Sequence, residues 1–248
     1  MGDINFINTM KIRLFTIPNI ITLANLMSGV AATIVTLQHH NYTLALALVV
    51  LAAVFDFFDG FVARLLNQQS PLGVQLDSLA DDVTFGLVPA VVMFDMYNHT
   101  SSYYGCASPI MSYLGYITLI IAAFSVLRLA KFNIDTTQST EFSGLPTPAN
   151  ALLLLSLAML FEQGNIMLYQ EHILLISVAM SLLLISPIRM FALKFKGFGW
   201  RGNQMRYIFI LASLLIIIFA TRYSVAIIIT LYIVVSTFVW LFSKREVK

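Results

Sequence analysis

Five of the twelve acidic residues of the chain lie in one segment, FDFFDGFVARLLNQQSPLGVQLDSLADD, at positions 55–82. They are Asp56, Asp59, Asp77, Asp81 and Asp82. The first two are three residues apart, and the third and fourth are four residues apart, so each pair lies on one face of a helix. The polar stretch between the pairs contains Pro71, which predicts a break between two helices. Two neighbouring helices would then each present a carboxylate pair to the groove between them.

These carboxylates need a compensating positive charge, because apolar runs flank the segment on both sides. An aspartate in the middle of a membrane helix costs about 2.5–3.5 kcal/mol. A solvated turn with capping aspartates would account for Asp82 but not for the other four. Carboxylate oxygens with no histidine or cysteine nearby favour Mg²⁺ or Mn²⁺ over a zinc-type site. Two such ions can clamp a displacement at phosphorus, so the cluster indicates phosphoryl-type chemistry, with Arg64 beside the metals to bind phosphate or pair with an aspartate.

The surrounding sequence is typical of a polytopic membrane protein. Of the 248 residues, 59% are hydrophobic and 10% are charged, and the mean hydropathy is +0.86. A soluble domain carries about 25% charged residues. The net charge of +2 gives no indication of nucleic-acid binding, and the single cysteine, Cys106, cannot form an intrachain disulfide. We therefore predict an all-α polytopic membrane protein.

About eight segments approach the length of roughly 20 apolar residues that a membrane-spanning helix needs. They lie at roughly 20–38, 43–66, 75–97, 109–131, 148–162, 172–193, 206–220 and 224–242. Residues 1–15 are predicted to form an interfacial helix on the membrane surface, with a disordered tail as the alternative. We predict a single domain over residues 1–248, with a core at about 16–193 and two further spans within about 206–242.

The positions of the lysines and arginines predict the orientation of the chain. With the N-terminus in the cytoplasm, thirteen of the fourteen lie at or near cytoplasmic ends, and only Arg222 faces outward. This distribution predicts a protein of the cytoplasmic (inner) membrane with both termini and the aspartate cluster on the cytoplasmic side. Asp95 alone lies toward the other face. A cation transporter, the alternative from a different class, is disfavoured because its carboxylates would be distributed across the membrane.

The aspartates also carry a family resemblance. The pattern Asp56-x-x-Asp59-Gly60-x-x-Ala63-Arg64, eight residues, Gly73-x-x-x-Asp77-x-x-x-Asp81 resembles the signature of the CDP-alcohol phosphotransferases at every fixed position. The resemblance implies that Asp56, Asp59, Asp77 and Asp81 hold two divalent ions and that Asp81 is also the general base. The implied reaction moves a phosphatidyl-type group from a CDP-linked lipid to an alcohol and releases CMP.

The resemblance also implies a binding site for the CDP-linked lipid. Its residues would be Asp56, Gly60, Ala63, Arg64, Gly73 and Asp77. The segment IPNIITLANLMSG resembles the family's entry to its first helix, which adds Asn19 and Thr22 as candidates. A plain helix cap followed by one threonine tolerated in lipid is the alternative explanation for these two residues.

Two further stretches, VLRLAKFN and EFSGLPTPAN, narrow the choice of the alcohol. Together they resemble the bacterial and archaeal membrane-embedded phosphatidylserine synthases, with Lys131 where arginine is usual. The resemblance implies CDP-diacylglycerol and L-serine as substrates, and a homodimer. The candidate serine-binding residues are Arg128, Lys131, Asn133, Gly144 and Pro146. Positive-inside anchoring and a stiff turn are the alternatives for these residues, and glycerol-3-phosphate or inositol phosphate is the alternative acceptor.

Overall fold

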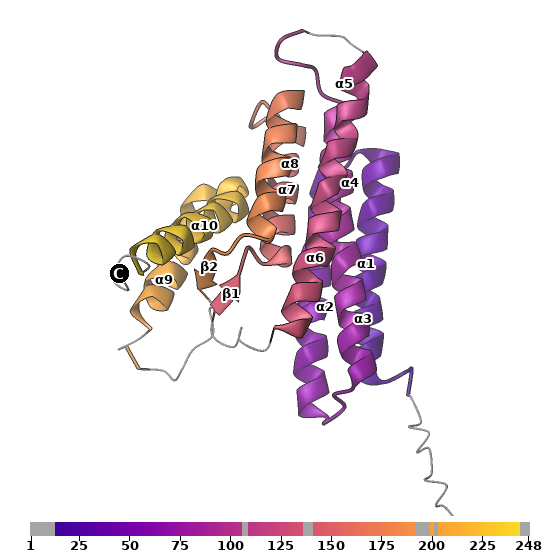
Figure 1. Cartoon of the computed structure of the whole chain (residues 1–248), viewed down its shortest axis with the longest axis vertical. Coiled ribbons are helices and arrows are strands. Elements are labelled where there is room, and N and C mark those ends of the chain that lie inside the picture. The colour runs from indigo at the N-terminus through magenta and orange to yellow at the C-terminus, as the bar shows by residue number, and fades with distance from the viewer. Residues whose placement is uncertain (1–12, 106–108, 136–140, 192–198, 201–202, 244–248) are drawn as a thin grey trace, which may run out of the picture.

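The computed structural model of the chain describes residues 13–105, 109–135, 141–191, 199–200 and 203–243. The described part is a helical bundle with one short antiparallel pair of strands (Figure 1). The helices are α1 (Ile17–His39), α2 (Tyr42–Leu65), α3 (Pro71–Asp81), α4 (Val88–Asn98), α5 (Pro109–Leu114), α6 (Ile120–Ile134), α7 (Thr147–Glu162), α8 (Gln170–Leu184), α9 (Gln204–Ala220) and α10 (Ser224–Ser243). The strands are β1 (Glu141–Ser143) and β2 (Arg189–Phe191). The predicted all-α class is confirmed.

The first two helices run antiparallel and are joined by a tight turn (Figure 1). Thr16 caps α1 by accepting a hydrogen bond from the main-chain N–H of Asn19 at 3.4 Å. The helix ends where His40 adopts a left-handed conformation with φ of 50°. Asn41 then caps α2 through its side-chain oxygen, which accepts from the N–H of Leu44 at 2.7 Å. The N-terminus of α1 therefore lies beside the C-terminus of α2, where the aspartates begin.

The predicted break between the second and third helices is confirmed. Ser70 caps α3 by accepting from the N–H of Gly73 at 3.0 Å, and Pro71 occupies the first turn. From Pro71 the chain stays helical to the end of α4, but Asp82–Leu87 between α3 and α4 form a π-helical segment. A π segment widens a helix locally and re-aims its side chains, and such segments are frequent at functional sites.

The π segment packs tightly against α1. Thr84 is fully buried, and its hydroxyl donates a hydrogen bond to the main-chain oxygen of Asn25 at 3.3 Å. A β-carbon on Gly29 would collide with the Thr84 side chain. The backbones of α1 and the π segment can approach this closely because residue 29 has no side chain.

The sixth predicted span, residues 172–193, is wrong at its C-terminal end. The helix α8 ends at Leu184, and residues 189–191 form β2, which pairs with β1. Pro187 cannot continue a helix because it lacks an N–H. The main-chain N–H of Gly144 donates to the main-chain oxygen of Ile188 at 2.9 Å. The N–H of Leu145 donates to the main-chain oxygen of Leu183 at 3.1 Å. These bonds hold the segment before α7 against the end of α8.

Each of the eight predicted spans contains helix, but four described helical stretches are long and apolar enough to cross a membrane. These stretches are Ile17–His39, Tyr42–Leu65, Gly115–Ile134 and Gln204–Phe242. The last is interrupted at Thr221–Tyr223, so that α9 and α10 form a hairpin beside α7 (Figure 1). The helices α7 and α8 are apolar but shorter. The predicted interfacial helix lies mostly outside the described residues, and residues 13–15 are not helical.

Candidate active site

The structure brings the four aspartates of the signature together between the C-terminal half of α2 and the C-terminal half of α3. Carboxylate oxygens of Asp56, Asp59 and Asp77 all lie within 4.8 Å of one another. The Asp56 carboxylate also lies within hydrogen-bonding reach of Asp77 and Asp81. Among the described residues, no lysine or arginine forms an ion pair with any of the four. The cluster therefore holds concentrated negative charge that no described lysine or arginine neutralises through an ion pair.

This arrangement fits hard divalent cations. The ligand atoms that converge are all carboxylate oxygens, which are the donors that Mg²⁺ and Mn²⁺ prefer. Like charges this close repel each other, and a bound cation would relieve the repulsion. Their close approach is thus consistent with a metal site, and the donor set does not distinguish Mg²⁺ from Mn²⁺.

The helix α1 supplies hydrogen bonds to two of these carboxylates. The hydroxyl of Thr22 donates to Oδ2 of Asp59 at 2.6 Å, and Nδ2 of Asn25 donates to Oδ1 of Asp81 at 3.2 Å. Asn19, Thr22 and Asn25 are all buried and follow one another at intervals of three residues, so they share one face of α1. The contact of Asn25 was not predicted from sequence. The spacing of Asn19, Thr22 and Asn25 was the signal in the sequence from which this contact could have been predicted.

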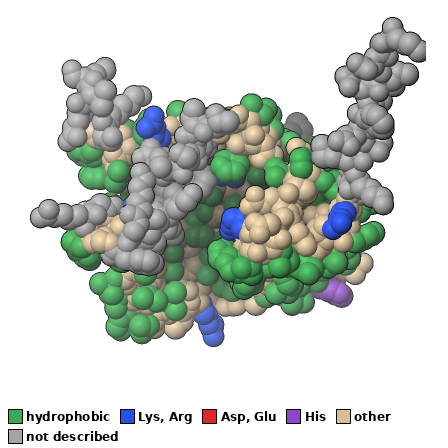
Figure 2. Space-filling model, turned by 90° about the horizontal axis from the view of Figure 1, so that it is seen from below, with side chains coloured by type: hydrophobic (Ala, Val, Ile, Leu, Met, Phe, Trp, Pro, Cys, Tyr) green, Lys and Arg blue, Asp and Glu red, His purple; other side chains and the backbone are tan. Residues whose placement is uncertain are grey.

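A cavity of about 260 Å³ opens beside the aspartates. It is lined by Pro18, Asn19, Thr22, Asp59, Gly60, Ala63, Arg64, Gln68, Gln69, Ser70, Gly73, Val74 and Asp77. Every residue predicted to bind the CDP-linked lipid lines this cavity except Asp56. Figure 2 views the molecule from this end of the bundle. Lysine or arginine side chains are visible on the described part of that face.

Small residues bring the cavity close to the helix backbones. A β-carbon on Gly73 would lie 3.3 Å from Oγ of Ser70 and 3.5 Å from Oδ1 of Asn19. A β-carbon on Gly60 would lie 3.4 Å from the Arg64 guanidinium. A larger side chain at either position would reduce the space between α1, α2 and α3, where a flat polar group could lie against the backbone.

The residues predicted to bind serine lie on α6 and on the segment before α7. The guanidinium of Arg128 is buried and donates to the Thr147 hydroxyl at 3.2 Å. Lys131 donates to the Ser143 hydroxyl at 3.3 Å. Asn133 instead contacts α3, where its Nδ2 donates to the Ser78 hydroxyl at 2.8 Å. These contacts bridge α6 to both the strand β1 and the helix that carries Asp77 and Asp81.

Gly144 and Pro146 flank Leu145 in the segment before α7. Gly144 is buried with φ of +80°, and a β-carbon there would collide with main-chain atoms at the end of α8. This position therefore needs glycine for packing and backbone conformation. Pro146 is half-buried at the start of α7.

Several polar atoms of α6 and α7 are buried without a hydrogen-bond partner. They are Nε of Arg128, Oγ of Ser125 and both amide atoms of Asn150. Arg128 also lies close enough to Asp81 for their charges to interact. Buried polar groups are usually paired, so a set of unpaired ones indicates a place that a polar ligand or water occupies. Ser125 and Asn150 were not predicted from sequence as site residues, although each is a polar residue within an apolar helix.

The chain belongs to the CDP-alcohol phosphatidyltransferase family, whose sequence model matches residues 15–185. That range contains every candidate site residue and excludes α9 and α10. The chain is 29% identical to the CDP-diacylglycerol–serine O-phosphatidyltransferase of Helicobacter pylori over 236 residues, which cover 92% of each chain. It is 34% identical to the protein of the same name in Bacillus subtilis over 59% of this chain and 77% of the relative. It is 31% identical to the protein of that name in Methanocaldococcus jannaschii, over 71% of this chain and 74% of the relative.

Proposed function

We propose that this protein transfers a phosphatidyl group from CDP-diacylglycerol to the hydroxyl of L-serine, giving phosphatidylserine and CMP. The observation that carries the proposal is the gathering of Asp56, Asp59, Asp77 and Asp81 beside a cavity lined by the other residues of the family signature. The names of the relatives support serine as the acceptor, and one of those relatives aligns over nearly the whole chain.

The CDP moiety binds in the cavity between α1, α2 and α3. Gly60, Ala63 and Gly73 let it lie against helix backbone, while Asn19 and Arg64 offer polar and charged contacts. Thr22 orients the Asp59 carboxylate through its 2.6 Å hydrogen bond. The acyl chains stay in the lipid, beside the exposed apolar faces of the helices.

The four aspartates would hold two divalent ions, Mg²⁺ or Mn²⁺, at this site. Such ions would neutralise the pyrophosphate and stabilise the CMP leaving group. Asp81 takes the proton of the attacking serine hydroxyl. The side chain of Asn25 holds Asp81 in position through its 3.2 Å hydrogen bond, and we assign Asn25 a positioning role. The serine oxygen forms a bond to the phosphorus on the diacylglycerol side, and the bond from that phosphorus to CMP breaks.

Serine binds on the side of Asp81 that faces α6. Arg128 and Lys131 provide positive charge for the serine carboxylate, and Asn133, Gly144 and Pro146 shape the surrounding pocket. The unpaired amide of Asn150 adds a polar group within the same region. A site that chooses serine over an uncharged alcohol needs such a cation, because a buried carboxylate is costly unless it is paired.

We further propose that all eight predicted segments span the membrane, with an interfacial helix at residues 1–15 and a core domain at about 16–193 followed by two further spans within about 206–242. The excess of lysine and arginine on one side supports an orientation with both termini and the active site in the cytoplasm. The location would be the cytoplasmic membrane, and the protein would act as a homodimer.

An isotope experiment tests the reaction. Purified protein is given CDP-diacylglycerol and L-serine labelled with ¹⁸O in its hydroxyl, with Mg²⁺ or Mn²⁺ present. We expect the label in phosphatidylserine and unlabelled CMP, in equal molar amounts. Chelation of the metal should stop the reaction, and its re-addition should restore it. Production of CMP without phosphatidylserine would contradict the proposed acceptor, whereas turnover that is insensitive to chelation would contradict the metal site.

A further inference from the structure

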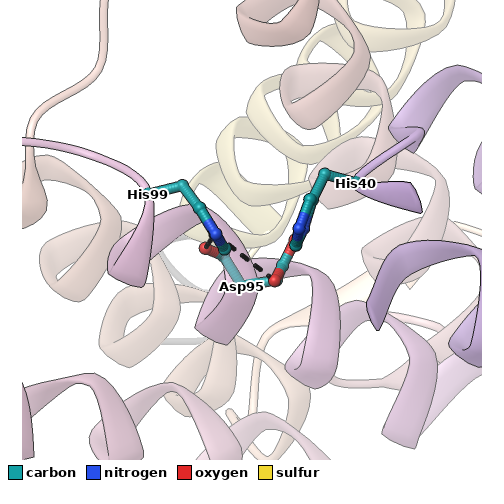
Figure 3. Close-up of side chains that lie close together, drawn as sticks. All are labelled: His40, Asp95 and His99. Carbon is teal, nitrogen blue, oxygen red and sulfur yellow. Dashed lines mark hydrogen bonds and ion pairs between the residues drawn. The ribbon is translucent and has the colours of Figure 1, made fainter. Parts of the chain in front are cut away.

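A second cluster of metal-binding side chains lies at the other end of the bundle from the aspartates. His40 follows α1, Asp95 lies in the last turn of α4, and His99 follows α4 (Figure 3). One potential ligand atom from each residue lies within 4.8 Å of the other two. Tyr42 is the first residue of α2 and Asp56 lies in its C-terminal half, so the two are separated by roughly 20 Å along the helix axis. The two clusters are therefore distinct sites.

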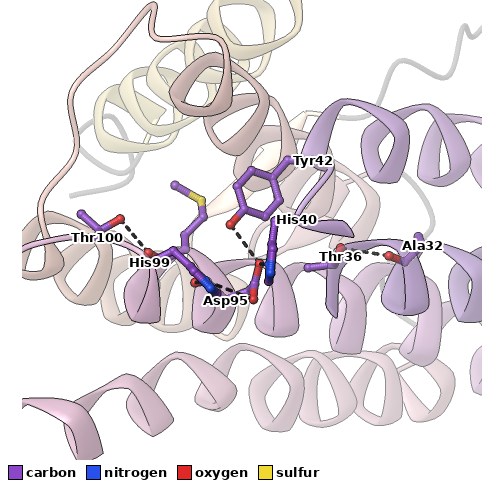
Figure 4. Close-up of polar contacts among 8 residues, drawn as sticks. Ala32, Thr36, His40, Tyr42, Asp95, His99 and Thr100 are labelled. Atoms are coloured by element: carbon purple, nitrogen blue, oxygen red, sulfur yellow. Dashed lines mark hydrogen bonds and ion pairs between the residues drawn. The ribbon is translucent and has the colours of Figure 1, made fainter. Parts of the chain in front are cut away.

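Asp95 is the centre of this cluster. Its side chain is 6% exposed, and its Oδ2 lies 2.9 Å from Nδ1 of His40. The same oxygen accepts a hydrogen bond from the Tyr42 hydroxyl at 3.0 Å (Figure 4). No described lysine or arginine forms an ion pair with it. A buried carboxylate is costly unless it is paired, and a cation bound between Asp95 and the two imidazoles would pair it.

The distances within the cluster suit a metal ion. Ligand bonds of 2.0–2.2 Å in tetrahedral geometry separate the ligand atoms by roughly 3.4 Å. The observed separations from Asp95 oxygens are 2.9 Å to Nδ1 of His40 and 3.4 Å to Nδ1 of His99. Nδ1 of His99 also lies 2.8 Å from the main-chain oxygen of Asp95, a contact that ligation would replace. Two imidazoles and one carboxylate form a donor set that Zn²⁺ and similar ions favour over Mg²⁺.

The backbone of His40 adopts an uncommon conformation. Its φ of 50° lies in the left-handed region, which costs a residue with a β-carbon roughly 1–2 kcal/mol. Glycine is the usual residue where a helix ends in this way. Here a histidine occupies the position, and its ring lies 4.2 Å from the ring of His99, measured between centroids. The strained conformation holds the imidazole over Asp95 (Figure 4).

We propose that His40, Asp95 and His99 bind a divalent transition-metal ion of the Zn²⁺ class. The ion neutralises Asp95 and ties the turn between α1 and α2 to the end of α4. In the bound state each imidazole carries its proton on Nε2 and offers Nδ1 as the ligand. The side chains of His40 and His99 are 46% and 52% exposed, so that the ion can enter from solvent and water can complete its coordination. This site does not depend on the proposed transferase reaction.

The experiment measures Zn²⁺ binding to the full-length protein in detergent, with excess Mg²⁺ present to occupy the aspartate cluster. We expect the wild type to bind one Zn²⁺ and to unfold at a higher temperature when Zn²⁺ is bound. His40→Gly suits the left-handed backbone and should fold well, but its dissociation constant for Zn²⁺ should rise at least about 100-fold, because it lacks a direct ligand. Asp95→Asn and His99→Ala should show the same loss.

His39→Ala is the matched control, because His39 is exposed on the adjacent position and lies outside the cluster. It should bind Zn²⁺ as the wild type does. Co²⁺ should give visible absorption in the wild type and in His39→Ala but not in His40→Gly. Equal Zn²⁺ binding by His40→Gly and the wild type would overturn the proposal. So would an absence of Zn²⁺ binding by the wild type, or a loss of binding in Asp77→Asn alone.

Discussion

The aspartates of the α2–α3 region differ in the partners that surround them. Asp59 and Asp81 accept hydrogen bonds from α1, whereas the Asp56 carboxylate interacts with those of Asp77 and Asp81. Asp82 follows directly in the chain, but a β-carbon on Gly86 would lie 2.7 Å from its Oδ1 and 2.8 Å from Oγ of Ser125 on α6. The side chain of Asp82 therefore lies toward α6. We therefore expect Asp81 and Asp82 to have different roles, although they are adjacent in the chain.

Asp77→Asn should lower turnover by at least about 100-fold, more than the loss typical of a residue that only orients a ligand. A neutral amide is a poorer ligand for Mg²⁺ or Mn²⁺ and no longer balances the charge of the metals. CMP release and Mn²⁺ binding by the purified variant measure the two effects. Asp82→Asn is the matched control and should keep most of the activity. If the two variants were equally inactive, the choice of metal-binding carboxylates would be wrong.

Arg128→Ala should raise the KM for serine about tenfold or more, while the KM for CDP-diacylglycerol changes little. A hydrogen bond to a charged group contributes about 1.5–3 kcal/mol, and each 1.4 kcal/mol corresponds to a factor of ten. Steady-state CMP release at varied serine concentration provides the measurement. Arg222→Ala, with its exposed arginine between α9 and α10, is the control. An unchanged serine KM in Arg128→Ala would remove Arg128 from the acceptor site.

The packing of α1 against the π segment holds the first-helix contacts of the site in place. Asn25 illustrates this link, because its side chain bonds Asp81 while its main-chain oxygen accepts from Thr84. The closeness of Gly29 to Thr84 sets how near the two elements can lie. A shift of α1 away from the π segment would therefore also move Asn25 away from Asp81, the proposed general base.

Gly29→Ala should destabilise the protein by about 1–3 kcal/mol, because an added methyl group in a tightly packed contact forces the backbones apart. The thermal unfolding midpoint in detergent should fall, and turnover should fall with it. Gly199→Ala is the control, since a β-carbon there would meet nothing within 4 Å. A Gly29→Ala protein as stable as the wild type would show that this contact can relax without cost.

Local sequence rules predicted the helices better than the contacts between them. The break before Pro71 and the pairing of aspartates on helix faces follow from spacing and from proline chemistry alone. The strand β2 could not be predicted in this way, because its partner β1 is distant in the sequence. Met190 of β2 pairs with Phe142 of β1, 48 positions earlier. The side chains of Asn25 and Asn150 were missed for the same reason. Their significance depends on which groups the tertiary fold places beside them.

At the scale of the whole molecule, the two polar clusters lie at opposite ends of an apolar bundle. The aspartate cluster lies between the C-terminus of α2 and α3, and the histidine cluster lies where α1 and α4 end (Figure 1). If the proposed orientation is correct, the first cluster meets the cytoplasm and the second meets the outside. Each site would then draw its ligands from a different compartment.

Cysteine labelling tests this orientation. After Cys106→Ser, single cysteines are introduced by His39→Cys and Leu66→Cys, both at exposed positions on opposite ends of the bundle. An impermeant thiol reagent added to intact cells should label only the variant at position 39. Both variants should be labelled after the membrane is permeabilised, which controls for reactivity. Labelling of position 66 in intact cells would reverse the orientation and place the aspartates outside the cytoplasm.

We propose that the aspartate cluster and its neighbouring cavity transfer a phosphatidyl group to serine. The most direct test gives the purified protein CDP-diacylglycerol with L-serine, glycerol-3-phosphate and inositol phosphate at equal concentrations, and identifies the lipid products by mass spectrometry. We predict that phosphatidylserine is the dominant product and that its amount equals the CMP released. A dominant glycerol-3-phosphate or inositol phosphate product, with no CMP release from serine alone, would contradict the account.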